Sequence, residues 1–160
     1  MSIHKQCYVT SIGRIFCGES TAFIYTWISK QWKIVYVGQT NDARGTLGRA
    51  RQHVGSSGTL RKRFEAEVGL PLESADDLIL LSFPLPAQSQ YMTEESSYRE
   101  AVEYLVQIGM YEARLRLSPA PKIISVIRCN PVRVSDVAIR RYADEILQVF
   151  SETYSSLADD

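Results

Sequence analysis

The stretch FIYTWISKQWKIVYVGQTNDARGTLGRARQH, residues 23–53, decides the fold. It contains two runs of aromatic and β-branched residues, 23–28 and 33–37, which are separated by a short polar segment. Runs of this kind on either side of a polar turn predict a β-hairpin. Tyr25 lies in the first run and Tyr36 in the second, so each expected strand carries a tyrosine.

A basic helix is expected directly after this hairpin. The residues that follow Gly38 are rich in Gly, Thr, Asn and Asp, and a helix is predicted over residues 46–53. Arg49 and His53 are four positions apart, so they share one face of that helix. Two strand tyrosines next to an arginine and a histidine are more typical of a functional site than of a core.

This arrangement resembles the GIY-YIG nuclease superfamily. The signature of that family is two tripeptides on either side of a short hairpin, followed by an arginine and often a histidine on the first helix. The matching tripeptides here are Phe23-Ile24-Tyr25 and Tyr36-Val37-Gly38, and Arg49 and His53 follow them. The resemblance covers residues 20–106 and implies a three-stranded, largely antiparallel sheet flanked by helices.

The chain departs from this signature at two points. Phe23 stands where the first tripeptide usually has glycine, and residues 41–45 resemble a loop inserted before Arg49. Neither departure removes a reactive side chain.

Further elements are expected after the hairpin and its helix. The apolar run at residues 78–83 predicts a buried central strand. The remaining predicted elements are a helix at 60–68 capped by Thr59, a long helix from about 93 to 117, a strand at 122–127, and a helix from the cap Ser135 to residue 154. We therefore expect one α+β domain over 1–160, with the nuclease-like core at 20–106, an N-terminal β extension at 1–19 and a C-terminal strand and helix at 119–154.

Composition excludes several classes of protein. The chain has 160 residues, which is enough for one core without disulfides or metals. No apolar run is long enough to cross a membrane, and the N-terminus lacks the apolar segment of a signal peptide, so we expect a cytoplasmic protein without membrane contact. The three cysteines have unrelated spacings, which favours reduced thiols over a disulfide framework or a zinc site.

Charge is balanced overall but uneven along the chain. The formal net charge is zero, yet residues 44–63 contain six basic residues and no acid. Such a stretch is compatible with phosphate contacts and equally with a solvated helix face. The residues expected to bind substrate are Gly38, Gln39, Arg44, Arg51, Arg61 and Lys62.

The resemblance also implies roles for individual residues. Tyr36, with Tyr25 beside it, would be the general base or would position the attacking water. An unassisted tyrosine is a poor base at neutral pH, because its pKa is near ~10. Arg49 would bind the scissile phosphate through its planar guanidinium, and Arg51 or Arg44 could replace it. His53 would contact phosphate or relay a proton.

A carboxylate is expected to hold the metal. Magnesium is bound in proteins by one or two carboxylates together with waters. The resemblance implies a glutamate on the helix after the third strand; Glu103 fits best as a ligand of Mg²⁺ or Mn²⁺, and Glu100 is the alternative. Asn130 is a further candidate site residue.

The resulting hypothesis is a metal-dependent endonuclease that hydrolyses phosphodiester bonds of DNA, with RNA not excluded. A compact member of this kind suggests bacterial or phage defence or restriction, with specificity from loops, a homodimer or a partner protein. The alternative is a nucleic-acid-binding or regulatory module that kept the scaffold without turnover. In a third case the motif match is accidental and the chain is an α+β interaction protein. Then Tyr25, Tyr36, Arg49 and Glu103 would not meet on one concave surface.

Overall fold

The computed structural model describes residues 9–127 and 132–157 and has the expected α+β architecture. Short 3₁₀ turns lie at Leu72–Ser74 and Arg114–Arg116. The helices and strands, in chain order, are β1 (Phe23–Ser29), β2 (Ile34–Thr40), α1 (Gly45–Val54), α2 (Thr59–Val68), β3 (Ile79–Pro84), the short α3 (Ser89–Met92), α4 (Ser97–Ala113), β4 (Lys122–Ile123) and α5 (Val137–Ser156). The predicted hairpin and the helices on both sides of β3 are confirmed.

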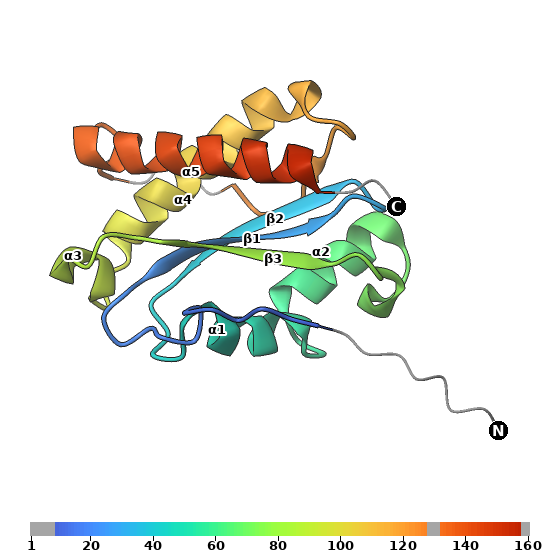
Figure 1. Ribbon diagram of the computed structural model, residues 1–160, viewed down its shortest axis with the longest axis horizontal. Helices are drawn as coiled ribbons and strands as arrows, with labels where there is room; N and C mark the ends of the chain where they lie inside the picture. The colour runs from blue at the N-terminus through green and yellow to red at the C-terminus, as the bar shows by residue number, and fades with distance from the viewer. Residues whose placement is uncertain (1–8, 128–131, 158–160) are drawn as a thin grey trace.

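The four strands form one sheet in the order β3-β1-β2-β4 (Figure 1). β1 pairs antiparallel with both β2 and β3, whereas β4 pairs parallel with β2. The sheet is therefore largely antiparallel, as expected. The prediction that residues 78–83 form a central strand is wrong, because β3 lies at the edge and residues 79–82 are only half-buried. The central position belongs to β1, which is buried along its whole length.

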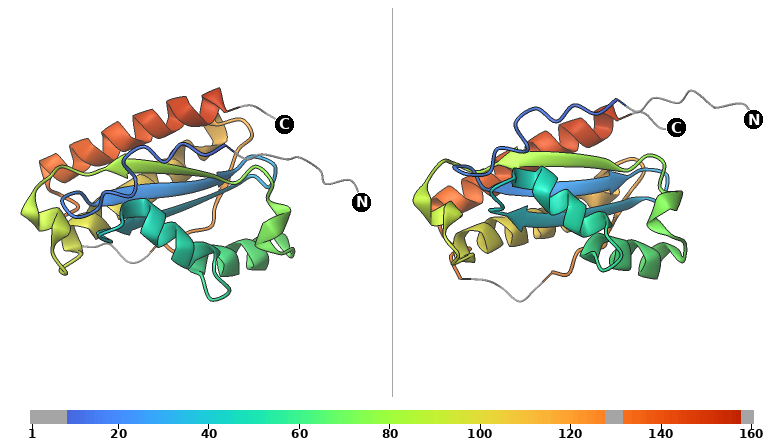
Figure 2. Two further views of the ribbon diagram at one scale, coloured as in Figure 1. Left: turned by 60° about the horizontal axis from the view of Figure 1, so that its bottom comes forward. Right: turned by 90° about the horizontal axis from the view of Figure 1, so that it is seen from below.

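Helices cover both faces of this sheet (Figure 1; Figure 2). Successive strand residues point to opposite faces, so the two sides of the hairpin enter two separate apolar layers. On one side, β1 and β2 pack against α2 through Tyr25, Trp27, Ile34, Tyr36, Leu60 and Phe64. On the other side, they pack against α4 and α5 through Ile24, Ile28, Val35, Val37, Val102, Val106, Ile146 and Phe150.

The segment before β1 does not form the expected strand in its described part, residues 9–22. Its backbone groups find partners on α1 and the loop before it instead of on a sheet edge. The N–H of Leu47 donates to the carbonyl of Ile15, and the N–H of Gly18 donates to the carbonyl of Ala43. Gly45 allows this approach, because it has φ +60° and a Cβ there would lie 2.1 Å from the Ile15 oxygen.

The strand predicted at 122–127 is much shorter than expected. β4 contains only Lys122 and Ile123. Beyond it, the N–H of Ile124 still donates to the carbonyl of Val35, and the N–H of Val37 donates to the hydroxyl of Ser125 at 2.5 Å. The Ser125 hydroxyl thus takes the place of a backbone acceptor. No described strand pairs with the outer edge of β2 from Tyr36 onward.

Two predicted helix caps are each displaced by one residue. α2 is preceded by Gly58 and begins at Thr59, so Thr59 is not its cap. α5 is capped by Asp136, whose carboxylate accepts from the N–H groups of Ala138 and Ile139 at 2.8 and 3.3 Å, and not by Ser135. A carboxylate also favours a helix N-terminus electrostatically.

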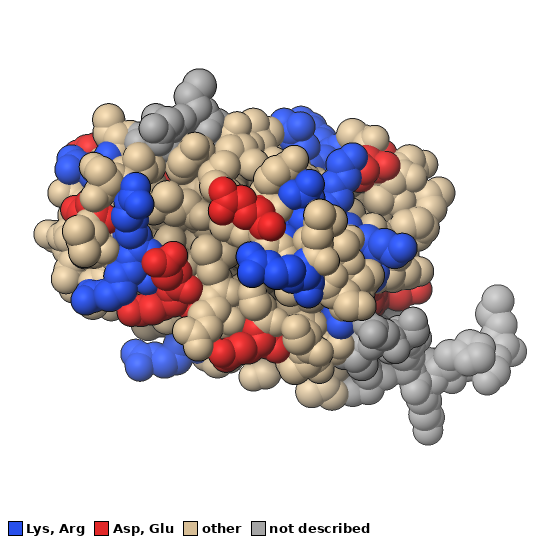
Figure 3. Space-filling model, turned by 90° about the horizontal axis from the view of Figure 1, so that it is seen from above, with Lys and Arg blue, Asp and Glu red and all other residues tan. Residues whose placement is uncertain are grey.

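The surface carries mixed charge over α5, where acidic and basic side chains alternate without a large patch of one sign (Figure 3). Within residues 9–127 and 132–157, no helix is both long enough and apolar enough to cross a bilayer.

The cap of α5 can be tested by substitution. We expect Asp136→Ala to lower the free energy of unfolding by about 1 kcal/mol, because two N–H groups lose their acceptor. Ser135→Ala is the matched control and should change it by less than about 0.5 kcal/mol. Urea unfolding followed by circular dichroism measures both. A larger loss in Ser135→Ala would mean that Ser135 is the cap after all.

Candidate active site

A cavity of about 350 Å³ lies where the outer edge of β2 is left without a strand partner. Residues from both sides of the sheet reach it, because the edge is the place where the two helical layers meet. The lining residues are Tyr25, Tyr36, Val37, Gly38, Gln39, Arg49, Thr59, Glu100, Glu103, Tyr104, Gln107, Ser125 and Val126.

The structure brings together most of the residues expected at the site. Tyr25 comes from β1, Tyr36 from β2, Arg49 from α1 and Glu103 from α4, and all four line this cavity. Gly38 and Gln39, two of the expected substrate-binding residues, line it as well. These positions run from residue 25 to residue 103, about half of the chain, so their convergence is a property of the fold and not of local sequence.

The pairing of Tyr25 with Gly38 explains the glycine of the second tripeptide. The two residues are directly opposite in the β1–β2 register. A Cβ on residue 38 would lie 2.3 Å from the Tyr25 hydroxyl oxygen and 2.4 Å from the ring carbon that bears it. The Tyr25 ring therefore lies on the bare backbone of Gly38, which fixes the ring at the cavity wall.

His53 lies behind the two tyrosines and does not line the cavity. Its side chain is 2% exposed, and its ring makes edge contacts with Tyr25 and Tyr36 at centroid distances of 5.4 and 5.2 Å. This position does not support the expected direct contact of His53 with phosphate, because the tyrosine rings shield the histidine side chain. A proton role through the Tyr25 hydroxyl is compatible with this position.

The hydrogen bonds of His53 define its tautomer. The N–H of Leu60 donates to Nδ1 at 3.4 Å, and Nε2 lies 2.5 Å from the hydroxyl oxygen of Tyr25. Because Nδ1 accepts, the neutral ring carries its proton on Nε2 and donates it to Tyr25. The hydrogen of the Tyr25 hydroxyl is then available to another acceptor.

Burial keeps both members of this pair neutral. Desolvation and, to a smaller extent, the nearby positive charge of Arg49 lower the pKa of His53 to about 4. Desolvation also raises the pKa of Tyr25, and the neighbouring Tyr36 adds to this effect, while the hydrogen bond from Arg49 opposes it. At neutral pH, Tyr25 is accordingly a hydrogen-bond donor and not a phenolate base.

Arg49 supplies the positive charge in the cavity lining. The guanidinium donates to Gln52 and to Tyr25, while its Nε is buried and has no partner among the described residues. An unpaired buried donor costs free energy that an incoming oxygen acceptor would recover. Arg49 is therefore prepared for an anionic ligand.

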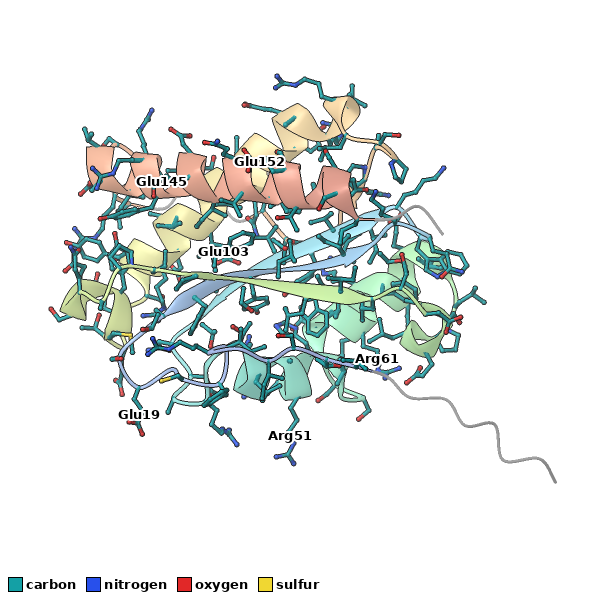
Figure 4. All side chains as sticks on the ribbon, viewed as in Figure 1. Glu19, Arg51, Arg61, Glu103, Glu145 and Glu152 are labelled. Atoms are coloured by element: carbon teal, nitrogen blue, oxygen red, sulfur yellow. The ribbon has the colours of Figure 1, made fainter. Side chains whose placement is uncertain are left out.

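Two carboxylates of α4 line this cavity together with Arg49. Glu103 lies between α4 and the sheet (Figure 4), and Gln107 donates to it at 3.4 Å. Glu100, one turn earlier, also lines the cavity and accepts from the hydroxyl of Ser96 at 2.5 Å. Both positions therefore suit a metal ligand. Within the described residues, no group of three or more His, Cys, Asp or Glu side chains could hold a metal ion.

The other basic residues expected to bind substrate do not line this cavity. Arg44 and Arg51 border a separate apolar hollow with Phe16 and Leu47, and Arg51 points away from the molecule (Figure 4). Lys62 is exposed on α2. Their contact with more distant phosphates stays a prediction. Asn130 lies outside the described residues.

Arg61 is engaged within the protein. Its guanidinium donates to both carboxylate oxygens of Glu73, to Glu65 and to the carbonyl of Val54. Because these acceptors occupy most of its donors, Arg61 is a structural cross-link between α2 and the turn after it, and its expected role in substrate binding is not supported.

Sequence reasoning missed several lining residues. Tyr104 and Gln107 share a helix face with Glu100 and Glu103, so the helical period could have found them. Arg99 does not line the cavity, but its 4%-exposed side chain donates to Gln39 at 2.7 Å and so positions that residue. Ser125 carries no sequence signal, because its place depends on where β4 stops.

The Tyr25–Gly38 packing predicts a steric effect. Gly38→Ala should lower the free energy of unfolding by about 1–3 kcal/mol, because the added methyl overlaps the Tyr25 ring. Gly55→Ala is the matched control, since a Cβ there makes only ordinary contacts at 3.6 Å. Urea unfolding compares the two variants. Equal stability of both would show that the ring does not lie on Gly38.

The buried histidine predicts a pH dependence. The pKa of His53 is near 6.5 in the unfolded chain and about 4 in the folded one, so the unfolded state binds more protons between these values. The stability is complete above pH 6.5 and falls as the pH decreases toward 4, by as much as about 3 kcal/mol. His53→Gln should remove this part of the pH dependence in urea unfolding at several pH values. An unchanged profile in the variant would contradict a neutral, buried His53.

Comparisons of the chain with protein-family models, curated proteins and solved structures gave no match. The interpretation of the site depends on its geometry, and the family resemblance of its motif stays a hypothesis.

Proposed function

We propose that this protein is a metal-dependent endonuclease of the GIY-YIG type that hydrolyses phosphodiester bonds in DNA. The observation that supports this proposal is the convergence of two tyrosines, an arginine and two carboxylates on one cavity. An accidental motif match would have left these side chains scattered. These groups suit phosphodiester hydrolysis, which needs a positive charge for the phosphate, a proton acceptor for water and a metal ligand.

In this proposal, Arg49 binds the scissile phosphate. Its unpaired Nε meets a phosphate oxygen, and the fixed charge of the guanidinium stabilises the negative charge that grows in the transition state. The side chain is placed at the cavity by α1.

The two tyrosines have different roles in the proposed reaction. Tyr25 receives the Nε2 proton of His53 in a hydrogen bond and donates its own hydrogen to a phosphate oxygen. Tyr36, which is in ring contact with His53 and lines the same cavity, orients the attacking water. After losing its own hydroxyl proton to solvent, it would accept the proton of that water as a phenolate. His53 is thus a positioning residue that acts through both tyrosines.

The α4 carboxylates suit a magnesium or manganese ion. Glu103 would hold the ion, with Glu100 as the second ligand, because hard divalent cations bind one or two carboxylates and keep several waters. The ion would neutralise charge on the phosphate and lower the pKa of a bound water. Both carboxylates and Arg49 line the same cavity, so a phosphate bound by Arg49 would lie near the ion.

A nicking assay on supercoiled plasmid tests the proposal. We expect the wild type to nick with Mg²⁺ or Mn²⁺ and to be inactive in EDTA. Arg49→Ala and Glu103→Ala should each lose roughly 10²–10³-fold in rate, because each removes a group that acts on the transition state. The matched controls are Arg116→Ala and Glu145→Ala, exposed positions outside the cavity, which should nick like the wild type.

DNA affinity separates the endonuclease from a binding module. Glu103→Ala should bind DNA about as well as the wild type while losing cleavage, as measured by fluorescence anisotropy. A folded wild type that binds DNA with either metal but never nicks it would favour the module without turnover. Equal nicking by all five proteins would indicate a contaminating nuclease and reject the assigned site.

A further inference from the structure

Tyr104 is a cavity residue that the proposed chemistry leaves unused. It lines the cavity on the same face of α4 as Glu100 and Glu103, one position after Glu103. Its side chain is half-buried, and within residues 9–127 and 132–157 it makes no hydrogen bond, ion pair or ring contact. The other tyrosines of the cavity both contact His53. An aromatic ring without a partner, next to the site for a phosphate, is suited to stack on a flat ligand.

A second apolar side chain lines the same cavity. Val126, on the segment that follows β4, lines the cavity beside Ser125. β4 and α4 pack together, so Tyr104 and Val126 belong to adjoining walls of one cavity. A planar group bound there can contact both the aromatic ring of Tyr104 and the aliphatic side chain of Val126. Arg49, Glu103 and Gln39 supply polar groups to the same cavity.

The size of the cavity limits what can enter. At about 350 Å³ it is at the small end of ligand pockets, whose volumes are about 300–1,000 Å³. A duplex, whose major groove alone is about 12 Å wide, can only lie across its mouth. One nucleotide is of a suitable size, provided that its base has left the stack or was never paired.

We propose that Tyr104 stacks on an unpaired nucleobase next to the scissile phosphate, so that the preferred substrate is single-stranded or locally unpaired DNA. This inference builds on the proposed nuclease function, because it uses Arg49 as the phosphate site. It assigns Tyr104 a specificity role that the motif residues do not supply. Aromatic platforms that bind bases in this way tolerate every base, because each base has a π face.

Binding to an end-labelled single strand in EDTA tests the inference without cleavage. We expect Tyr104→Ala to weaken binding roughly 5- to 100-fold, because stacking on one base is lost, whereas Tyr104→Phe retains the affinity. Tyr111→Ala is the matched control, since Tyr111 lies on the same helix, is 49% exposed and packs on Arg114 instead of lining the cavity. A strand made wholly of abasic sugar-phosphate should bind the wild type as weakly as the ordinary strand binds Tyr104→Ala.

Cleavage gives the second readout. With Mg²⁺, the wild type should cut a duplex at an unpaired stretch faster than a fully paired duplex, and Tyr104→Ala should lose this preference. Equal affinity of wild type and Tyr104→Ala for the single strand, or equal binding of the abasic strand, would overturn the inference even if plasmid nicking is intact. If the protein binds the single strand through Tyr104 but never cuts DNA, the base-stacking role stands and the nuclease function is rejected.

Discussion

The register between β1 and β2 is the constraint on which the rest of the structure depends. It places Tyr25 opposite Gly38 and Trp27 opposite Tyr36. A slip of one residue would turn every side chain of a strand to the other face. The tyrosines would then enter the layer of α4 and α5, and Ile24 would face α1 and α2. The same pairing thus decides both which residues form the core and which reach the cavity.

When helices cover both faces of a sheet, the side chains on one face are normally separated from those on the other. Here the sheet ends early on one side, because β4 contributes only two residues. Beyond them, the Ser125 hydroxyl takes the place of a backbone acceptor for Val37. The tyrosines and Arg49 come from one layer and the α4 carboxylates from the other, and the open edge of β2 is where they meet. The site therefore exists because no strand of residues 9–127 and 132–157 pairs with that part of the edge.

Local patterns predicted those parts of the structure that local physics controls. Alternation and turn chemistry were sufficient for the hairpin of Tyr25 and Tyr36, and the helical period placed Glu103 near the core. Features that depend on distant partners could not be predicted. Arg61 resembled a phosphate contact because its acceptor Glu73 belongs to a separate turn. His53 resembled an exposed ligand because nothing local shows that Tyr25 covers it. The end of β4 was unpredictable for the same reason.

The helix that carries Arg49 is attached to the fold in an unusual way. Its buried residues are Gly45, Thr46, Gly48 and His53, while Leu47 and Val54 are exposed. α1 therefore buries no large aliphatic side chain. Polar contacts of His53 and of the segment before β1 hold much of the helix against the rest of the protein. Elements with few buried apolar contacts are the ones that unfold locally while the rest of a protein stays folded. α1 should consequently detach at a lower free energy than the sheet unfolds, and Arg49 would then leave the cavity with it while the sheet remains native.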